Sequence, residues 1–382
     1  MKIIHVTASY KPAYIYGGPI QSVAKLCEAM VEISDGEDLQ VLTTTANGTE
    51  ELEVQTGKVS LTDSVPVTYF KRWTKDHSHF SPELLIQLRN TILQTQDSKL
   101  IIHIHAWWNL VSVLSCLIAK WHKIPVLLSP RGMLTSYSFG NRNSISKNLI
   151  HNILGKKLLK YCHIHATSEQ EKQDILKIIT PKSITVISNL VSFPSSAPSL
   201  QSSANNIFQL LFLSRIEEKK GLELLFEALT LVDIPWQLTI AGSGKAEYVE
   251  SLKLKAEMLK PSNRIKWLGL VDKEKKFDLL ADHDLTVLTS HNENFANVVI
   301  ESLSVGTPVL VSKYVGLADY VKDKELGWVT SLNVDEIKTE LVSAYREATK
   351  REKIRTEAPS LIKDDFNDVN LAKKYIELYN RI

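Results

Sequence analysis

Two glutamates lie close together in the second half of the chain. Glu293 and Glu301 have seven residues between them, within the stretch 290–308. Apolar runs at Leu285–Leu288 and Val309–Ser312 predict buried strands on either side of it, with a helix between them. At 1.5 Å of rise per residue the two carboxylates are expected to lie on the order of 10 Å apart along the helix axis. That is too far to share a proton. This spacing suits one ligand that both carboxylates contact, with an anionic group of the ligand facing the helix N-terminus.

Two cations follow another predicted strand at Phe208–Leu213. Arg215 and Lys220 lie in the loop that leads to a helix expected to begin near Leu222. Two cations beside a helix N-terminus form a stronger anion site than either alone, and a diphosphate fits it. The alternative is a charged, exposed loop, which the acidic Glu217 in the same segment favours.

The first half offers a weaker set of candidates at predicted strand ends. Gly17 and Gly18 lie where a loop meets a helix, and glycine there lets backbone N–H groups approach a ligand, although a plain turn has the same composition. Arg131 follows a predicted strand at 125–129, where its guanidinium is placed to meet an anion. The alternative, pairing with a neighbouring carboxylate, is weakened by the lack of acids nearby in sequence. His105 ends a predicted strand, Trp107 and Asn189 follow predicted strands, and all three are assigned to a cleft.

Histidines recur in His-x-His pairs, and in one of them the two imidazoles alternate with isoleucines and so share a face of a strand. Metal ligation is one interpretation of such pairs. None has a carboxylate or cysteine partner with matching spacing, so no metal site is predicted. The pairs are His77/His79, His103/His105 and His163/His165.

Length and composition bound the class of protein. At 382 residues the chain is expected to form two domains. A net charge of +2 with 23% charged residues demands no nucleic-acid partner. The three cysteines are far apart in sequence and in apolar contexts, which predicts reduced core residues in the cytoplasm. The N-terminal apolar run is too short for a signal peptide, and the longest apolar stretch, 110–119, is too short to span a bilayer.

Charge is distributed unevenly along the chain. Residues 98–168 contain nine basic residues and no Asp or Glu. One interpretation is a solvated helix face near an anion site. The other is a surface that docks on anionic lipid, with the protein peripheral on the inner face of the plasma membrane. The second rests on the stretch Lys147–Lys160, where lysines alternate with apolar residues: Lys156, Lys157 and Lys160 with Ile153, Leu154, Leu158 and Leu159.

The order of predicted elements indicates an α/β protein with a boundary near the middle. Residues 193–206 are rich in Ser, Pro, Ala and Asn, which is typical of a linker. The domains are therefore expected at 1–193 and 207–365, with the linker at 194–206. A terminal amphipathic helix is expected within 366–382.

Motifs in both halves carry a resemblance to a known family. SRIEEKKG, AGSGK, WLGLV and NENFANVVIESLSVGTPVLVS follow one another in the second half, and YIYGGP, HIHAWWN, SPRGML and HATSEQE in the first. In this order and spacing they resemble family 4 retaining glycosyltransferases of the GT-B fold. The resemblance implies two Rossmann-like domains facing a central cleft, the first binding the acceptor and the second the nucleotide-sugar donor, with the terminal helix crossing back to the first domain.

The activity implied is transfer of a hexose from a nucleotide diphosphate sugar to a glycan or lipid-linked acceptor in cell-surface polysaccharide synthesis. UDP is the favoured base and GDP the alternative. No metal or other cofactor is expected, because fixed cations take its place. The catalytic set would be Glu293, which holds the sugar, Arg215 and Lys220, which bind the diphosphate, and Arg131. The donor-binding set would be the base-contacting turn Gly269-Leu270, Gly17 and Gly18, the backbone of Asn294, Phe295, Ala296 and Asn297, and Glu301 on the ribose.

The sequence departs from the family at two positions. Arg131 stands where many members have His, and would meet an anionic donor or acceptor instead. Ala296 stands where Gly is frequent, which adds a methyl group close to the sugar and is expected to change pocket shape modestly.

Three other functions remain open from the residues. Glu293 and Glu301 would suit a hydrolase by distance, although Arg215 and Lys220 would then have no diphosphate to bind. The others are a nucleotide-sugar epimerase and a nucleotide-sugar-binding protein without turnover.

Overall fold

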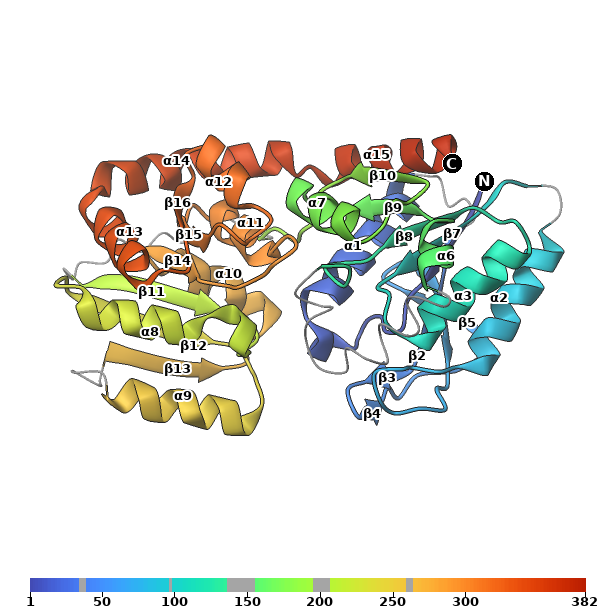
Figure 1. Ribbon diagram of the computed structural model, residues 1–382, viewed down its shortest axis with the longest axis horizontal. Helices are drawn as coiled ribbons and strands as arrows, with labels where there is room; N and C mark the ends of the chain where they lie inside the picture. Colours follow the sequence, from blue (N-terminus) through green and yellow to red (C-terminus); the bar gives the residue numbers. More distant parts are fainter. Residues whose placement is uncertain (34–38, 96–97, 136–154, 195–206, 259–263) are drawn as a thin grey trace. The chain divides into compact units, whose positions relative to one another are not determined.

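The computed structural model describes residues 1–33, 39–95, 98–135, 155–194, 207–258 and 264–382. The chain forms two compact units, Met1–Val191 with Asn367–Ile382, and Ser192–Phe366. Each unit is an α/β structure in which helices cover a mainly parallel sheet (Figure 1). The last segment of the chain therefore belongs to the first unit and not to the second.

The first unit contains, within the described ranges, an eight-stranded sheet in the order β10-β9-β8-β7-β1-β2-β6-β5. Its pairings are parallel except that of β5 with β6. Most of these strands are short apolar runs, as expected for a parallel sheet covered on both faces. Their bounds are β1 Lys2–Val6, β2 Leu39–Thr44, β5 Val59–Thr62, β6 Val65–Phe70, β7 Leu100–His105, β8 Val126–Ser129, β9 His163–Ala166 and β10 Ser183–Val186.

Helices cover this sheet and begin at recognisable caps. The side chain of Asn109 accepts a hydrogen bond from the Ser112 backbone N–H, and Ser168 accepts one from that of Glu171. The other described elements are a short 3-10 turn, a small hairpin and the packed helices. They are η1 Tyr14–Tyr16, α1 Gly18–Ile33, β3 Ala46–Asn47, β4 Glu50–Glu51, α2 Pro82–Gln94, α3 Leu110–Trp121, α6 Lys156–Leu159 and α7 Glu169–Ile178.

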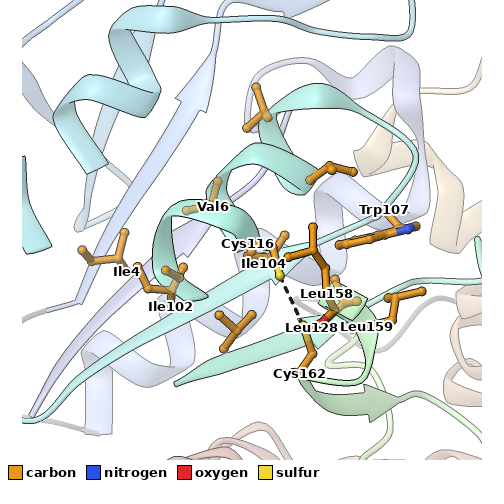
Figure 2. Packing of buried hydrophobic residues seen from close by; sticks show 14 of the residues in the cluster. Ile4, Val6, Ile102, Ile104, Trp107, Cys116, Leu128, Leu158, Leu159 and Cys162 are labelled. Atoms are coloured by element: carbon orange, nitrogen blue, oxygen red, sulfur yellow. Dashed lines mark hydrogen bonds between the residues drawn. The ribbon is translucent and has the colours of Figure 1, made fainter. Parts of the chain in front are cut away.

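Apolar residues of β1, β7 and β8 pack against α3 and α6 to form the core of the first unit (Figure 2). The three cysteines are free and buried, as predicted for core residues. Two of them, Cys116 and Cys162, place their sulfur atoms 3.4 Å apart inside this core.

The second unit has a six-stranded parallel sheet, within the described residues, in the order β13-β12-β11-β14-β15-β16. The strands predicted at Phe208–Leu213, Leu285–Leu288 and Val309–Ser312 are confirmed with these bounds as β11, β14 and β15. Strand order reverses at β11 and β14, because β12 and β13 extend one edge while β15 and β16 extend the other. A ligand in such a sheet binds outside the carboxyl ends of the strands at this switch point. The remaining strands are β12 Trp236–Ala241, β13 Ile265–Gly269 and β16 Gly327–Thr330.

The helices of the second unit include α11, Asn297–Ser304, which follows β14. Gly306 ends it with a φ of +84°, and a Cβ there would lie 2.5 Å from the backbone oxygen of Arg355. Only glycine therefore allows the chain to turn from α11 into β15 at this point. The other described elements are η3 Glu218–Lys220, α8 Leu222–Leu231, α9 Ala246–Met258, α10 Lys273–Ala281, α12 Ala318–Asp323, α13 Val334–Arg346 and α14 Ala348–Asp365.

The terminal helix α15, Asp368–Arg381, packs on α1 of the first unit (Figure 1, red). An ion pair joins Lys25 on α1 to Asp368, with 2.9 Å between Nζ and Oδ2. The apolar stripe predicted from the sequence buries Leu371, Ala372 and Tyr375. The return of this helix to the first unit agrees with the predicted architecture. No helix in the described parts of the chain is long and apolar enough to cross a membrane.

Candidate functional site

The loop between β14 and α11 is held by hydrogen bonds to the loop that follows β11. The hydroxyl of Thr289 donates to the Gly221 carbonyl at 2.8 Å, and the N–H of His291 donates to the Lys219 carbonyl at 2.8 Å. Gly221 has a φ of +66°, and a Cβ there would lie 2.1 Å from the Thr289 carbonyl oxygen. The loops after β11 and β14 are therefore fastened together at the switch point of the sheet.

Glu293 is fixed on both sides of its backbone. Its N–H donates to the Tyr314 carbonyl at 3.0 Å, and its own carbonyl accepts from the N–H of Gly316 at 2.8 Å. Its carboxylate forms an ion pair with the ammonium of Lys220, and the side chains are 12% and 9% exposed. The structure thus brings together two residues that are 73 positions apart in the sequence.

Neighbouring cations determine the charge of this carboxylate. Burial acts to raise the pKa of Glu293, but Lys220 and Lys219 outweigh it and the pKa is lowered. Arg215 contributes in the same direction. It is more exposed than Lys220, at 44%, and its guanidinium lies 2.7 Å from a carboxylate oxygen of Glu217. The predicted cations and Glu293 therefore share one electrostatic cluster, in which each cation faces a carboxylate.

The start of α11 has an unusual backbone. Ala296 precedes the helix with φ +70° and ψ +77°, a left-handed conformation that alanine seldom adopts. No side chain caps this helix, and the Ala296 carbonyl accepts from the N–H of Val299 at 3.0 Å. Phe295 is 1% exposed and packs against the ring of Phe366. The loop of Asn294, Phe295, Ala296 and Asn297 is thus anchored by Phe295, and the ligand contacts of its backbone stay a prediction.

Glu301 lies within α11 and forms a second buried ion pair. Its Oε1 is 2.6 Å from the ammonium of Lys276 on α10, and the side chains are 6% and 12% exposed. The base-contacting turn predicted at Gly269 and Leu270 lies at the end of β13. Gly269 has a φ of +69° and Leu270 is 75% exposed. No structural observation here tests their role.

In the first unit Arg131 is turned into the protein. It follows β8 with a φ of +52° and is 9% exposed. Its NH1 donates to Ser22 Oγ at 3.0 Å and to Asn189 Oδ1 at 2.9 Å, and its NH2 lies 3.4 Å from His105 Nδ1. Burial lowers the pKa of this guanidinium. The structure therefore joins Arg131, Asn189 and His105, all predicted from sequence, in one buried cluster with Ser22 of α1.

Buried histidines extend this cluster across the sheet. His5 Nδ1 lies 2.9 Å from His105 Nε2, and Ser129 Oγ bridges His103 and His165 at 2.7 and 2.8 Å. Burial lowers the pKa of His5 and of His165 to about 3, with Arg131 adding to the effect. These imidazoles are therefore neutral at pH 7.

Helix α15 closes this layer with two hydroxyl groups. Tyr379 Oη lies 2.7 Å from His103 Nδ1, and Tyr375 Oη lies 2.9 Å from His165 Nε2. The predicted sharing of one face by His103 and His105 is confirmed, with ring centroids 4.1 Å apart. The same hydrogen bonds join the last helix of the chain to the sheet.

Three imidazoles of this layer meet the geometric requirement for a metal site. Nitrogen atoms of His5, His103 and His105 lie within 4.8 Å of one another. Both nitrogens of His103 already have hydrogen-bond partners, and the guanidinium of Arg131 lies beside His105. A fixed positive charge there opposes a cation, so the donor set favours a hydrogen-bonded layer over a metal site.

The remaining first-unit candidates differ in exposure. Trp107 is 1% exposed and lies among the leucines and isoleucines of the core, as Figure 2 shows. This burial indicates that the Trp107 ring packs in the core of the first unit. Gly17 has a φ of +72°, and the adjacent Gly18 begins α1 in an exposed position. This glycine turn is accessible from the solvent, as its predicted role requires.

The predicted lipid-facing stretch needs a correction. Leu158 and Leu159 are buried in the core of the first unit at 1% and 0% exposure, and do not face outward. Lys156, Lys157 and Lys160 are exposed. Lys147, Ile153 and Leu154 lie outside the described residues. Of the apolar side of this pattern, the described residues Leu158 and Leu159 therefore pack inside the protein and are not available to lipid.

Sequence reasoning missed Lys276, Lys219, Tyr375 and Tyr379 as parts of these two clusters. Lys276 lies in a charged run on α10, where nothing local distinguishes it from its neighbours. For the tyrosines the sequence predicts only the amphipathic terminal helix that carries them. A signal was available for them: each has a hydroxyl that needs a partner when it is buried.

Comparison with known proteins defines the class and then the family. Solved structures share the whole fold: Anabaena Alr3699/HepE in complex with UDP-glucose matches over all of both chains at a TM-score of 0.73 and 20% identity. WaaG, a glycosyltransferase of lipopolysaccharide biosynthesis, matches 99% of each chain at a TM-score of 0.70 and 14% identity. The chain therefore has the GT-B fold.

Family matches cover both halves. "Glycosyltransferase Family 4" matches residues 16–193 and "Glycosyl transferases group 1" matches residues 201–361. The chain is 22% identical to a Mycobacterium tuberculosis glycogen synthase over 86% of its own length and 81% of that protein's. It is 30% identical to an uncharacterized glycosyltransferase of Methanocaldococcus jannaschii over 44% of each. The chain belongs to the group 1 glycosyltransferases, as its motifs predicted.

Proposed function

We propose that this glycosyltransferase moves a hexose from a UDP-sugar to a glycan or lipid-linked acceptor of a cell-surface polysaccharide. The ion pair of Lys220 with Glu293, fixed at the switch point beside the start of α11, is the observation that carries the proposal. It supplies a buried cation for a diphosphate and a carboxylate for sugar hydroxyls in one place. The neighbour crystallised with UDP-glucose supports UDP as the base. A relative named for lipopolysaccharide core biosynthesis in Rhizobium meliloti, 29% identical over 32% of this chain, supports the acceptor class.

The mechanism follows from where negative charge develops. As the bond from the sugar to the diphosphate breaks, charge accumulates on the leaving phosphate. Lys220, Arg215 and the uncapped N-terminus of α11 would stabilise that charge. Each cation faces a carboxylate in this structure, so a bound diphosphate exchanges one anionic partner for another and does not meet a bare cation. Glu293 is then released to accept hydrogen bonds from the sugar.

Retention of configuration and independence of metal are part of the proposal. No nucleophilic side chain is assigned to the sugar carbon. The acceptor hydroxyl would attack from the face that the diphosphate leaves, and the leaving phosphate oxygen would take its proton. Fixed cations would supply the charge that a divalent metal supplies elsewhere.

The test is a product assay with purified protein. It would be offered UDP-hexoses and GDP-mannose, with lipid-linked and soluble glycan acceptors, in the presence of Mg²⁺ or EDTA. We expect acceptor-dependent release of UDP, a product with the donor's anomeric configuration, and equal rates in both buffers. Release without product would indicate a hydrolase. An epimerised donor formed without acceptor would indicate an epimerase, and binding without either would indicate a carrier protein.

Peripheral membrane association is proposed on a narrower basis than the sequence indicated. Lys156, Lys157 and Lys160 are exposed, and Trp121 at the end of α3 is 82% exposed. The ammonium of Lys120 donates to the Lys157 carbonyl at 3.2 Å, which joins the two segments. Lysines around an exposed tryptophan suit the headgroup region of an anionic bilayer.

Vesicle sedimentation tests this association. We expect binding to phosphatidylglycerol vesicles that weakens with salt, and loss of it when Lys156, Lys157 and Lys160 are changed to Glu. Equal binding to neutral phosphatidylcholine vesicles at every salt concentration would contradict the proposal.

A further inference from the structure

The ion pair between Lys276 and Glu301 has no assigned purpose. It joins α10 to α11 at 2.6 Å, and both side chains are nearly buried. Lys276 is also 4.9 Å from the ring centroid of the adjacent Phe277, which lies 8% exposed in the second unit's core. The ammonium is therefore held on two sides, by a carboxylate and by an aromatic face.

The pairing engages only half of the carboxylate. Lys276 donates to Oε1, and among the residues that the structure describes none donates to Oε2. An ammonium on one oxygen fixes the rotation of the carboxylate plane. A carboxylate fixed in this way can accept from two neighbouring hydroxyl groups in a set direction, whereas a freely rotating one loses that geometry.

Electrostatics gives the lysine a second effect. In the proposed function a diphosphate binds at Lys220, which pairs with Glu293 in the loop before α11. An unpaired Glu301 would repel that anion at a distance at which charges still interact. Lys276 neutralises Glu301 locally, so the carboxylate can contact the ribose without weakening the diphosphate site.

We propose that Lys276 is a positioning residue that orients Glu301 toward the ribose diol and makes the donor site select ribonucleotides over 2′-deoxyribonucleotides. This inference rests on the proposed function and on the ribose contact that the family resemblance implies for Glu301. It assigns to Lys276 a role in specificity that is separate from catalysis.

The experiment compares the affinities of UDP and 2′-deoxy-UDP by calorimetry. The wild type should prefer UDP by about tenfold, the value of one hydrogen bond to a charged group. Lys276→Met should reduce that preference to near unity, and Lys276→Arg should retain most of it. Lys275→Met is the matched control, since Lys275 is the exposed neighbour on the same helix and should leave the ratio unchanged.

The ratio separates positioning from a purely structural role. A structural ion pair would weaken both nucleotides equally when removed, and an unchanged ratio in Lys276→Met would overturn the inference. If Lys276→Met fails to fold, Lys276→Gln is measured in its place, because its amide can still donate to the buried Glu301 carboxylate but carries no charge, and its preference for UDP should fall below that of the wild type. A wild type that binds UDP without preference overturns this inference alone. A wild type that binds neither UDP nor GDP overturns the proposed function as well.

Discussion

The two units satisfy their buried polar side chains in different ways. In the first, imidazoles, hydroxyls and one guanidinium bond to one another, and the histidines are neutral. In the second, Lys220 and Lys276 each face a carboxylate. A network built mainly of neutral groups stabilises the unit in which it lies, whereas the buried charge pair of Lys220 with Glu293 can exchange partners with an incoming anion. In the proposed function it is therefore the second unit that receives the charged ligand.

The largest expected difference between the two units is in how their stability changes as the pH falls. The pKa of His5 and of His165 is about 3 in the folded protein and 6.5 in the unfolded chain. Below pH 6.5 the unfolded state therefore binds more protons, and stability falls as the pH falls. The loss should reach about 3 kcal/mol per pH unit for the two residues together. The lowered pKa of Glu293 acts in the same direction, but only below its unfolded value of 4.5.

Hydrogen–deuterium exchange at pH 7, 6 and 5, corrected for the intrinsic effect of pH, reports the two units separately. We expect protection to fall first in the first unit. His5→Gln should reduce the pH dependence by about half, since His165 remains, and His77→Gln, at an exposed position, should leave it unchanged. Equal loss of protection in both units between pH 7 and 5 would contradict the comparison.

Removing a cation from the second unit should affect turnover more than folding. Lys220→Met should lower kcat/KM by about 100- to 1000-fold, as expected for loss of one fixed group that stabilises developing charge. Lys253→Met is the matched control, because Lys253 forms a surface pair with Glu250 on α9. Steady-state kinetics with the identified donor is the measurement. Equal rates in the two variants would remove Lys220 from the mechanism.

Removing a hydroxyl from the first unit should affect folding more than turnover. Tyr375→Phe leaves the imidazole of His165 without one of its partners and should cost about 1–3 kcal/mol of unfolding free energy. Tyr320→Phe in the second unit loses a more exposed bond to Asp365 and should cost less. Urea unfolding of both variants would show this order, and the reverse order would argue against a stabilising network.

The smallest effect concerns Ala296. Its φ of +70° costs alanine about 1 kcal/mol, which glycine would not lose. Ala296→Gly should therefore stabilise the protein by about that amount, whereas Ala228→Gly within α8 should destabilise it by about the same. Thermal unfolding measures both. A destabilised Ala296→Gly would mean that the methyl group has packing contacts that outweigh the backbone strain.

Local sequence signals predicted the fold well and the contacts poorly. The strands at Leu285–Leu288 and Val309–Ser312 are short apolar runs bounded by polar or turn residues, and such runs determine strand positions almost alone. The pairing of Lys276 with Glu301 depends on two helices meeting, which no spacing encodes. Arg131 is predicted to meet an anion from its position after a strand, and the lack of acids nearby in sequence weakens the alternative of a carboxylate partner. In the structure its partners are neutral groups from α1, β7 and the end of the first unit's sheet.

The first unit can complete its fold only after helix α15 has been synthesised. The chain leaves that unit after Val191, completes the second one, and returns at Asn367. While the chain is being made, His103 and His165 lack the hydroxyls of Tyr379 and Tyr375 until the final residues emerge. The unit that begins first therefore finishes last, and until then its sheet exposes the surface that the last helix covers. A premature stop within α15 would therefore destabilise the first unit more than the second unit, although the second unit is synthesised just before α15.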